Sequence, residues 1–117
     1  MNRPPQWQVV HLNQIVNQEF LELPKVLQAK FLRLAALVEE FGLEMIGEPY
    51  VKHLEGKLWE MRVKASAGYG RGIYCAWVDR QVVVLRYFIK KGPKTPVREL
   101  ETARRRLMTL KEKTENT

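Results

Sequence analysis

Apolar residues recur at helical spacing in the first third of the chain. Within residues 24–41 they stand three or four positions apart, and Gly42 follows as a stop signal. Asn13 is suited to cap a shorter preceding helix, and the Leu23-Pro24 pair separates the two because proline disfavours a helical residue before it. The pattern predicts two helices in a helical hairpin. The apolar stripe of the longer helix consists of Leu27, Phe31, Leu34, Val38 and Phe41.

Alternating apolar and polar residues indicate strands in the second half of the chain. Residues 57–64 alternate regularly, so that Met61 falls on one face and Arg62 on the other. Residues 71–78 and 81–89 form two more strands, and the short Asp79-Arg80 link predicts that they are antiparallel neighbours. A β-branched run predicts a further strand near the N-terminus. That strand covers residues 7–12, while 43–56, 65–70 and 90–94 are expected to be connecting segments or loops.

The last element is a basic amphipathic helix. Thr95 is placed to act as its N-cap, with Pro96 at the first helical position. The element order is therefore strand, two helices, a three-stranded meander and a helix. This order is typical of an α+β domain with a small, mostly antiparallel sheet, and 117 residues fit one domain over residues 1–117. The inner stripe of the helix consists of Val97, Leu100, Ala103, Leu107 and Leu110, and its outer side carries Arg98, Arg104, Arg105 and Arg106.

Composition narrows the possible classes of protein. The single cysteine, Cys75, excludes an internal disulfide and offers no metal-binding spacing. The chain lacks an apolar run of about eighteen residues, which a membrane span needs, and its first residues lack the apolar core of a signal peptide. We therefore expect a cytoplasmic protein that uses no metal or other cofactor and does not bind a membrane.

Charge is distributed unevenly along the chain. Residues 1–50 contain four Lys/Arg and six Glu, a net charge of −2, whereas residues 51–117 contain sixteen Lys/Arg and seven acids, a net charge of +9. Such one-sided charge favours a polyanionic partner. Nucleic acid is the first candidate, and an acidic protein segment is the second.

Three sequence blocks follow one another in the basic part of the chain. They are Leu-Trp-Glu-Met-Arg at residues 58–62, Arg-Gly-Ile-Tyr at 71–74 and Phe-Ile-Lys-Lys at 88–91, the last followed by Thr95, Pro96, Glu99, Ala103 and Arg106. In this order and spacing they resemble the HigB/RelE-type toxins of bacterial toxin–antitoxin systems, in particular the phage-derived HigB-like branch. The resemblance extends from Trp7 to Leu107.

This resemblance implies a RelE-like fold and a ribosome-dependent messenger-RNA endonuclease that inhibits translation. Such toxins act without a metal and assist a ribose 2′-hydroxyl in attacking the neighbouring phosphate. The implied partners are the ribosome, mRNA and a cognate antitoxin, expected to be a helix-turn-helix protein encoded beside the toxin. One position departs from the family pattern. Relatives often have a histidine two residues before the phenylalanine of the last strand, where this chain has Arg86.

In-line attack by a 2′-hydroxyl needs a proton acceptor, positive charge for the phosphorane and a proton donor for the leaving oxygen. Arg62 and Arg71 lie on adjacent predicted strands, where their guanidinium groups can bind phosphate oxygens bidentately. The alternative is a pair of ordinary sheet arginines, with Arg62 bridging Glu60. Lys90 and Lys91 follow the last strand, and one of them is a candidate for proton transfer if neighbouring cations lower its pKa. The alternative is a solvated charge run.

Arg86 and Tyr87 complete the catalytic candidates, although adjacent strand residues cannot both face one site. Tyr87 is equally well interpreted as a core aromatic residue. We expect His11 to be structural and His53 to have no role in the site. We expect Trp59, Trp77 and Phe88 to lie in the core. Candidate RNA contacts are Lys57, Lys64, Tyr69, which we expect on an exposed loop, Lys94, Arg98 and Arg105.

Three functions are compatible with this pattern. The first is the endoribonuclease toxin. The second is a non-catalytic nucleic-acid-binding or regulatory module on the same fold, for which mutations would weaken binding additively and in a salt-dependent way. The third is an interaction protein whose basic face binds an acidic partner.

Overall fold

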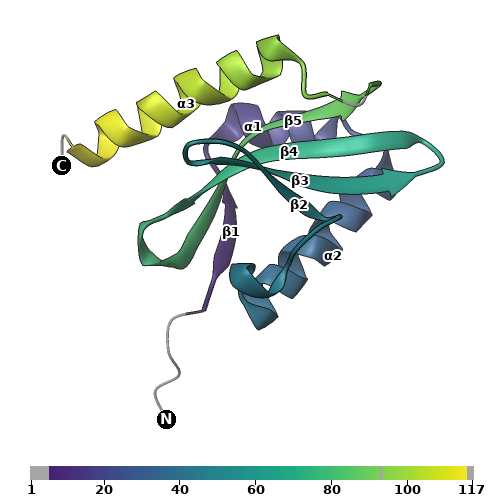
Figure 1. Cartoon of the computed structure of the whole chain (residues 1–117), viewed down its shortest axis with the longest axis horizontal. Coiled ribbons are helices and arrows are strands. Elements are labelled where there is room, and N and C mark those ends of the chain that lie inside the picture. Colours follow the sequence, from purple (N-terminus) through teal and green to yellow (C-terminus); the bar gives the residue numbers. More distant parts are fainter. Residues whose placement is uncertain (1–5, 93, 116–117) are drawn as a thin grey trace.

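The computed structural model describes residues 6–92 and 94–115 (Figure 1). A five-stranded sheet has the strand order β1-β5-β4-β3-β2. Strand β1 runs parallel to β5, and every other pair is antiparallel. The predicted α+β class with a mostly antiparallel sheet is therefore confirmed. In chain order the strands and α-helices are β1 (Gln8–His11), α1 (Gln14–Leu21), α2 (Lys25–Phe41), β2 (Val51–Glu55), β3 (Leu58–Ala65), β4 (Gly68–Trp77), β5 (Gln81–Lys90) and α3 (Val97–Glu115).

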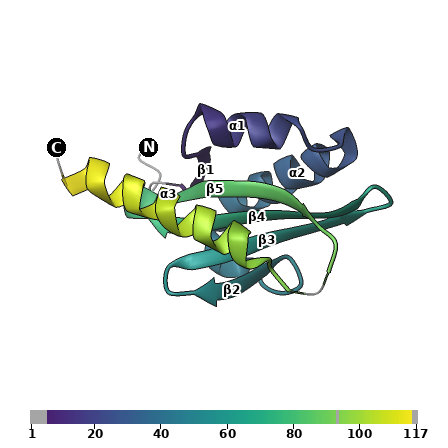
Figure 2. The same ribbon diagram turned by 90° about the horizontal axis from the view of Figure 1, so that it is seen from above.

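The helices cover both faces of the sheet (Figure 2). Helices α1 and α2 pack on one face, where Phe20 and Phe31 meet Tyr87 of β5. Helix α3 packs on the other face through Ala103 and Leu107. The sheet residues in the core under α1 and α2 are Val51, Met61, Val63, Tyr74, Val82, Val84 and Tyr87. The sheet residues in the core under α3 are Leu58, Ile73, Cys75, Val83, Leu85 and Phe88.

Local signals determine the two N-terminal helices. The Asn13 side chain accepts a hydrogen bond from the Val16 backbone N–H at 3.1 Å and caps α1, as predicted. Gly42 ends α2 with a φ of 92°, a backbone region that favours glycine. Leu27, Phe31, Leu34 and Val38 form the buried stripe of α2, whereas Phe41 at its last turn is exposed.

Several predicted boundaries were wrong. Residues 43–56, predicted to be a connecting segment, contain β2, so the meander has four strands rather than three. Residues 65–70 are not a loop, because Ala65 ends β3 and β4 begins at Gly68. Lys90 belongs to β5 rather than to the following loop. Helix α3 begins at Val97, whose side chain is exposed rather than part of the inner stripe.

A partly buried ion network fixes the free edge of β5. Strand β1 ends at His11, which pairs with Val84, so beyond Val84 the edge of β5 that faces β1 has no partner strand. Leu85 is an extra residue at a bulge in the pairing of β5 with β4. The Glu19 carboxylate accepts from the Tyr87 N–H at 3.3 Å, and Arg106 donates to the Leu85 carbonyl at 2.7 Å. Buried backbone groups require such partners. Ion pairs of Glu19 with Arg86 and Arg106, and of Arg86 with Glu99, join α1, β5 and α3.

None of the helices in the described part of the chain is long and apolar enough to cross a membrane.

We predict that Gly70→Ala destabilises the fold. A Cβ at residue 70 would lie 2.9 Å from side-chain carbon atoms of both Phe31 on α2 and Val63 on β3, so these buried side chains would have to shift. Overpacking of this kind costs about 1–3 kcal/mol, measurable by urea denaturation. The control is Gly47→Ala, because a Cβ at residue 47 meets no atom within 4 Å. Equal stability of the two variants would contradict this account of the β4–α2 contact.

Candidate functional site

The sheet register places the basic side chains of three strands on one face. Arg62 of β3 pairs with Arg71 of β4, and Arg71 pairs with Phe88 of β5. One row further along, Lys64, Tyr69 and Lys90 pair in the same way. Since side chains alternate along a strand, both rows project from the face that α3 covers in part. The predicted neighbours Arg62 and Arg71 are thus brought together.

A buried carboxylate lies among these cations. Glu60 precedes Arg62 on the same face of β3, and its side chain is fully buried. One oxygen, Oε1, lies 3.1 Å from Arg62 Nε and 3.4 Å from Arg71 Nε. The other oxygen, Oε2, accepts a hydrogen bond from the Thr95 hydroxyl at 2.8 Å. Thr95 therefore binds Glu60 instead of acting as the predicted N-cap, and it anchors the segment before α3 to the sheet.

The two arginines keep part of their surface open to solvent. The side chain of Arg62 is 24% exposed and that of Arg71 is 11% exposed. Arg71 Nη1 also donates to the Gly70 carbonyl at 3.1 Å, while its Nε makes no hydrogen bond. The Tyr69 ring is exposed beside them, with Arg71 Cζ and Lys64 Nζ 5.7 and 5.6 Å from its centroid. Cationic donors beside an exposed aromatic ring suit a phosphodiester and its base.

Lys90 is the most buried cation of this group. It is only 3% exposed, and its side chain makes no ion pair or hydrogen bond with the residues that the structure describes. Burial lowers its pKa, and repulsion from Arg71, Arg62 and Lys52 lowers it further, whereas attraction to Glu60 opposes the shift. Its lowered pKa makes Lys90 a better proton donor than an ordinary solvated lysine. We define the cationic cluster as Glu60, Arg62, Arg71 and Lys90.

Tyr87 and Arg86 are not part of the cationic cluster. Tyr87 points into the core under α1 and α2, where its hydroxyl lies 3.0 Å from His11 Nε2 and burial raises its pKa. The Arg86 guanidinium is held by Glu19 and Glu99, with Arg86 Nε 3.1 Å from Glu99 Oε2. The sequence did not indicate these two carboxylates as partners of Arg86, because they come from α1 and α3.

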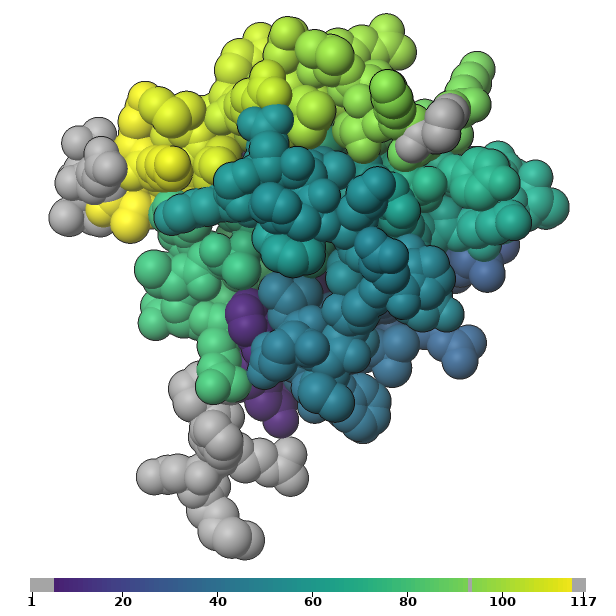
Figure 3. Space-filling view, in the orientation of Figure 1, coloured from purple at the N-terminus to yellow at the C-terminus, as the bar shows by residue number. Residues whose placement is uncertain are grey.

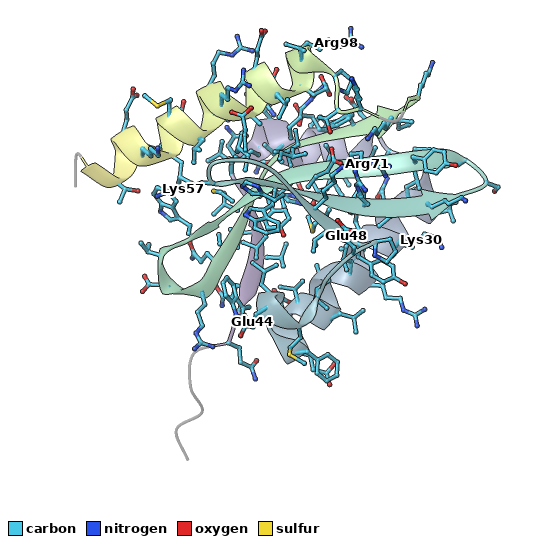
Figure 4. The ribbon with its side chains drawn as sticks, in the orientation of Figure 1. Lys30, Glu44, Glu48, Lys57, Arg71 and Arg98 are labelled. Atoms are coloured by element: carbon cyan, nitrogen blue, oxygen red, sulfur yellow. The ribbon has the colours of Figure 1, made fainter. Side chains whose placement is uncertain are left out.

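The other predicted RNA contacts divide into two groups. Lys64 and Tyr69 lie beside the cationic cluster, and Lys94 is exposed on the segment after β5. The catalytic candidate Lys91 is also exposed on that segment, outside the cluster. Arg71 lies within the sheet and Arg98 at the start of α3, whereas Lys57 lies at the left, at the turn between β2 and β3 (Figure 4). Lys57 precedes Lys64 by seven positions in the sequence, which corresponds to a distance of about 23 Å along an extended strand. Lys57 instead places its ammonium 5.4 Å from the centroid of the Trp77 ring.

Helix α3 extends the basic surface away from the cluster. In the space-filling view, α3 (yellow-green to yellow) lies along the teal surface of β2 and β3 (Figure 3). Arg104 holds it there by donating to both oxygens of Glu55 on β2. Arg98 and Arg105 are exposed on α3, whereas Arg106, predicted to lie on the outer side, is partly buried against Glu19.

Neither histidine lies on the face of the cationic cluster. His11 contacts Asn17 and Tyr87 under α1, and His53 packs on Trp59, 4.8 Å between ring centroids, on the opposite face of the sheet. Trp59 is exposed rather than buried in the core as predicted, whereas Phe88 is buried. No group of three His, Cys, Asp or Glu side chains close enough to hold a metal ion occurs in residues 6–92 and 94–115.

Glu60 and Thr95 were missed as site residues, although the bridge between Arg62 and Glu60 that the alternative interpretation named is present. The available signal was the Glu-Met-Arg spacing, which puts Glu60 and Arg62 on the same strand face. The burial of Glu60 and its contact with Thr95 depend on how the segment before α3 returns to the sheet, and the alternation within one strand does not show this.

The family model for the phage-derived Gp49-like proteins (DUF891) matches residues 18–108. The chain belongs to this family. A search of curated proteins gives no match to this Gp49-like sequence. Its structure is similar to a chain of the archaeal RelE–RelB complex from Pyrococcus horikoshii OT3, with a TM-score of 0.55 and 24% sequence identity, over 75% of this chain and 99% of that chain. This similarity confirms the RelE-like fold.

We predict that Lys90 of this Gp49-like protein titrates below 10.5, the ordinary pKa of a lysine. Burial disfavours the charged ammonium, and three neighbouring cations add repulsion. The measurement is a pH titration of ¹³C-labelled lysine side chains by NMR, with Lys90→Arg to assign the signal. A Lys90 signal that titrates at or above 10.5 would contradict the prediction.

Proposed function

We propose that this protein is the toxin of a type II toxin–antitoxin system, in the phage-derived HigB-like branch. It acts as a metal-independent endoribonuclease that cleaves mRNA on the translating ribosome and so inhibits translation. The observation that carries the proposal is the cationic cluster, in which Arg62, Arg71 and Lys90 surround one buried carboxylate on a sheet face. The RelE-like fold and the three sequence blocks support it.

The cluster supplies two of the three functions that the reaction needs. Arg62 and Arg71 bind the non-bridging oxygens of the scissile phosphate and stabilise the charge that develops on the phosphorane. The 2′-oxygen attacks the phosphorus while the bond to the 5′-oxygen breaks, which gives a 2′,3′-cyclic phosphate and a 5′-hydroxyl. The Lys90 ammonium gives a proton to the leaving 5′-oxygen. Water takes the proton of the 2′-hydroxyl, because neither histidine lies on this face.

Residues around the cluster bind the single-stranded message and the ribosome. The exposed Tyr69 ring offers a stacking surface for a base next to the scissile phosphate. Lys64 lies beside this ring, Lys91 and Lys94 are exposed on the segment after β5, and Arg98 and Arg105 extend the basic surface along α3. Exposed cations of this kind contact the phosphate backbone without reading sequence. Activity on the ribosome places the protein in the cytoplasm.

The proposed protein partner is a cognate antitoxin, a helix-turn-helix protein encoded beside this chain. The support is the RelE–RelB complex, in which a protein of the same fold is found together with RelB. Binding of the antitoxin holds the nuclease inactive.

A second candidate function is a non-catalytic RNA-binding module. The observation that favours it is the absence of a histidine from the face of the described cluster, together with the engagement of Arg86 by Glu19 and Glu99. Such a module would bind RNA in a salt-dependent way without cleaving it.

The test is induction of the protein alone in a bacterial host, with mapping of new mRNA 5′ ends. We expect growth arrest and new ends within translated regions. Arg71→Ala and Lys90→Ala each remove a positively charged side chain that acts on the reacting phosphate, so we expect about 100-fold fewer new ends and loss of growth arrest.

Arg33→Ala is the matched control, because Arg33 is an exposed cation on α2, which packs on the opposite face of the sheet. It should arrest growth like the unmodified protein. Circular dichroism establishes that each variant is folded. An unmodified, folded protein that produces neither arrest nor new ends, yet binds RNA, would replace the nuclease by the binding module.

A further inference from the structure

The cationic cluster contains an electrostatic conflict that its geometry resolves. Arg62 and Arg71 are directly opposite each other on neighbouring strands, and like charges in that position destabilise a sheet. Lys90 adds a third positive charge on the next strand. Each of these cations is at least three-quarters removed from solvent, so water screens their repulsion poorly.

Glu60 is the carboxylate that balances these charges. Its Oε1 lies within 3.4 Å of the Nε atoms of both Arg62 and Arg71, so one oxygen joins the two guanidinium groups at their inner edges. Arg71 Nη1 donates to the Gly70 carbonyl, whereas Arg71 Nη2 and both Nη atoms of Arg62 are left for a ligand. Its Oε2 accepts from Thr95, which fixes the carboxylate plane and ties it to the segment bearing Lys91 and Lys94. With full burial and these contacts, Glu60 has little freedom to move.

We propose that Glu60 is a positioning residue for phosphoryl transfer, which orients the two arginines and limits the net charge of the site. This proposal rests on the proposed function. Three cations and one carboxylate give the cluster a net charge of +2. Glu60 acts through Arg62 and Arg71 and does not itself contact the RNA. Removing its charge strengthens the attraction of RNA to the site but leaves the two guanidinium groups mutually repelled and poorly aligned.

This division of roles predicts opposite changes in affinity and turnover. In Glu60→Gln the net charge of the cluster rises to +3, so a short single-stranded RNA should bind about fivefold more tightly at low salt. Misaligned arginines stabilise the transition state less well, so single-turnover cleavage on programmed ribosomes should slow at least about tenfold. A purely structural loss would weaken both binding and cleavage.

Glu55→Gln is the matched control for charge. Glu55 is a half-exposed carboxylate on β2 that pairs with Arg104 on α3, so its variant adds the same unit of charge outside the cluster. We expect it to retain the cleavage rate of the unmodified protein. If Glu55→Gln and Glu60→Gln slow cleavage equally, or if neither does, the positioning role is overturned.

A second variant decides the case if Glu60→Gln does not fold. Glu60→Asp keeps the charge but moves the carboxylate away from the arginines, so we expect unchanged RNA affinity and slower cleavage. Unchanged cleavage by a folded Glu60→Asp protein would overturn the proposal.

One readout is independent of nuclease activity. Attraction to Glu60 raises the pKa of Lys90, so Glu60→Gln should lower the Lys90 titration in NMR, and Glu55→Gln should not. If the unmodified protein cleaves no RNA while this shift is observed, the proposed function fails and the electrostatic role of Glu60 stands. If cleavage is observed and the shift is absent, the role of Glu60 fails alone.

Discussion

The candidate site depends on one buried carboxylate. Burying the charge of Glu60 without partners would be strongly unfavourable, and burying two opposed arginines beside a lysine would be equally so. Together the charges offset one another, because Glu60 Oε1 lies between the two guanidinium groups and Oε2 binds Thr95. The fold can therefore keep the mostly buried side chains of Arg62, Arg71 and Lys90 close together. Because water screens their positive charges poorly, these charges attract a bound phosphate strongly.

Strand β5 connects this site to the rest of the structure. Its residues alternate between the core under α1 and α2, which receives Tyr87, and the α3 face, which receives Phe88 and Lys90. Glu19 and Arg106 hold its free edge by pairing with backbone groups at the bulge. The same ion network joins α1 to α3, so β5 is held between elements from both ends of the chain. A functional group on a rigid strand is placed more precisely than one on a loop.

Much of this fold was predictable because its signals are local. The Asn13 cap, the stripe of α2 and the short Asp79-Arg80 link each act within a few residues, and the structure contains the elements that they predict. Strand β2 was missed because Gly47, Pro49 and Gly56 around it are typical of loops, and an edge strand needs only one partner.

The site was only partly predictable, for a related reason. The order of the predicted strands placed Arg62 and Arg71 on adjacent strands, and the register pairs them directly. The burial of Glu60 and Lys90, and the placement of Tyr87 in the opposite core, depend on contacts between segments far apart in the sequence. The partners of Arg86 are Glu19 and Glu99, which come from helices near the two ends of the chain. These two carboxylates neutralise the charge of Arg86. No pattern within one strand contains that information.

The account is tested most directly by the chemistry of the cut RNA ends. Purified protein is added to ribosomes programmed with a defined mRNA, and the termini of the fragments are identified at the cleaved bond. Attack by the 2′-hydroxyl predicts a 2′,3′-cyclic phosphate on the upstream fragment, a 5′-hydroxyl on the downstream fragment, and no cut where that nucleotide is 2′-deoxy. Fragments with a 5′-phosphate, or cleavage at the deoxy position, would contradict the mechanism assigned to the cationic cluster.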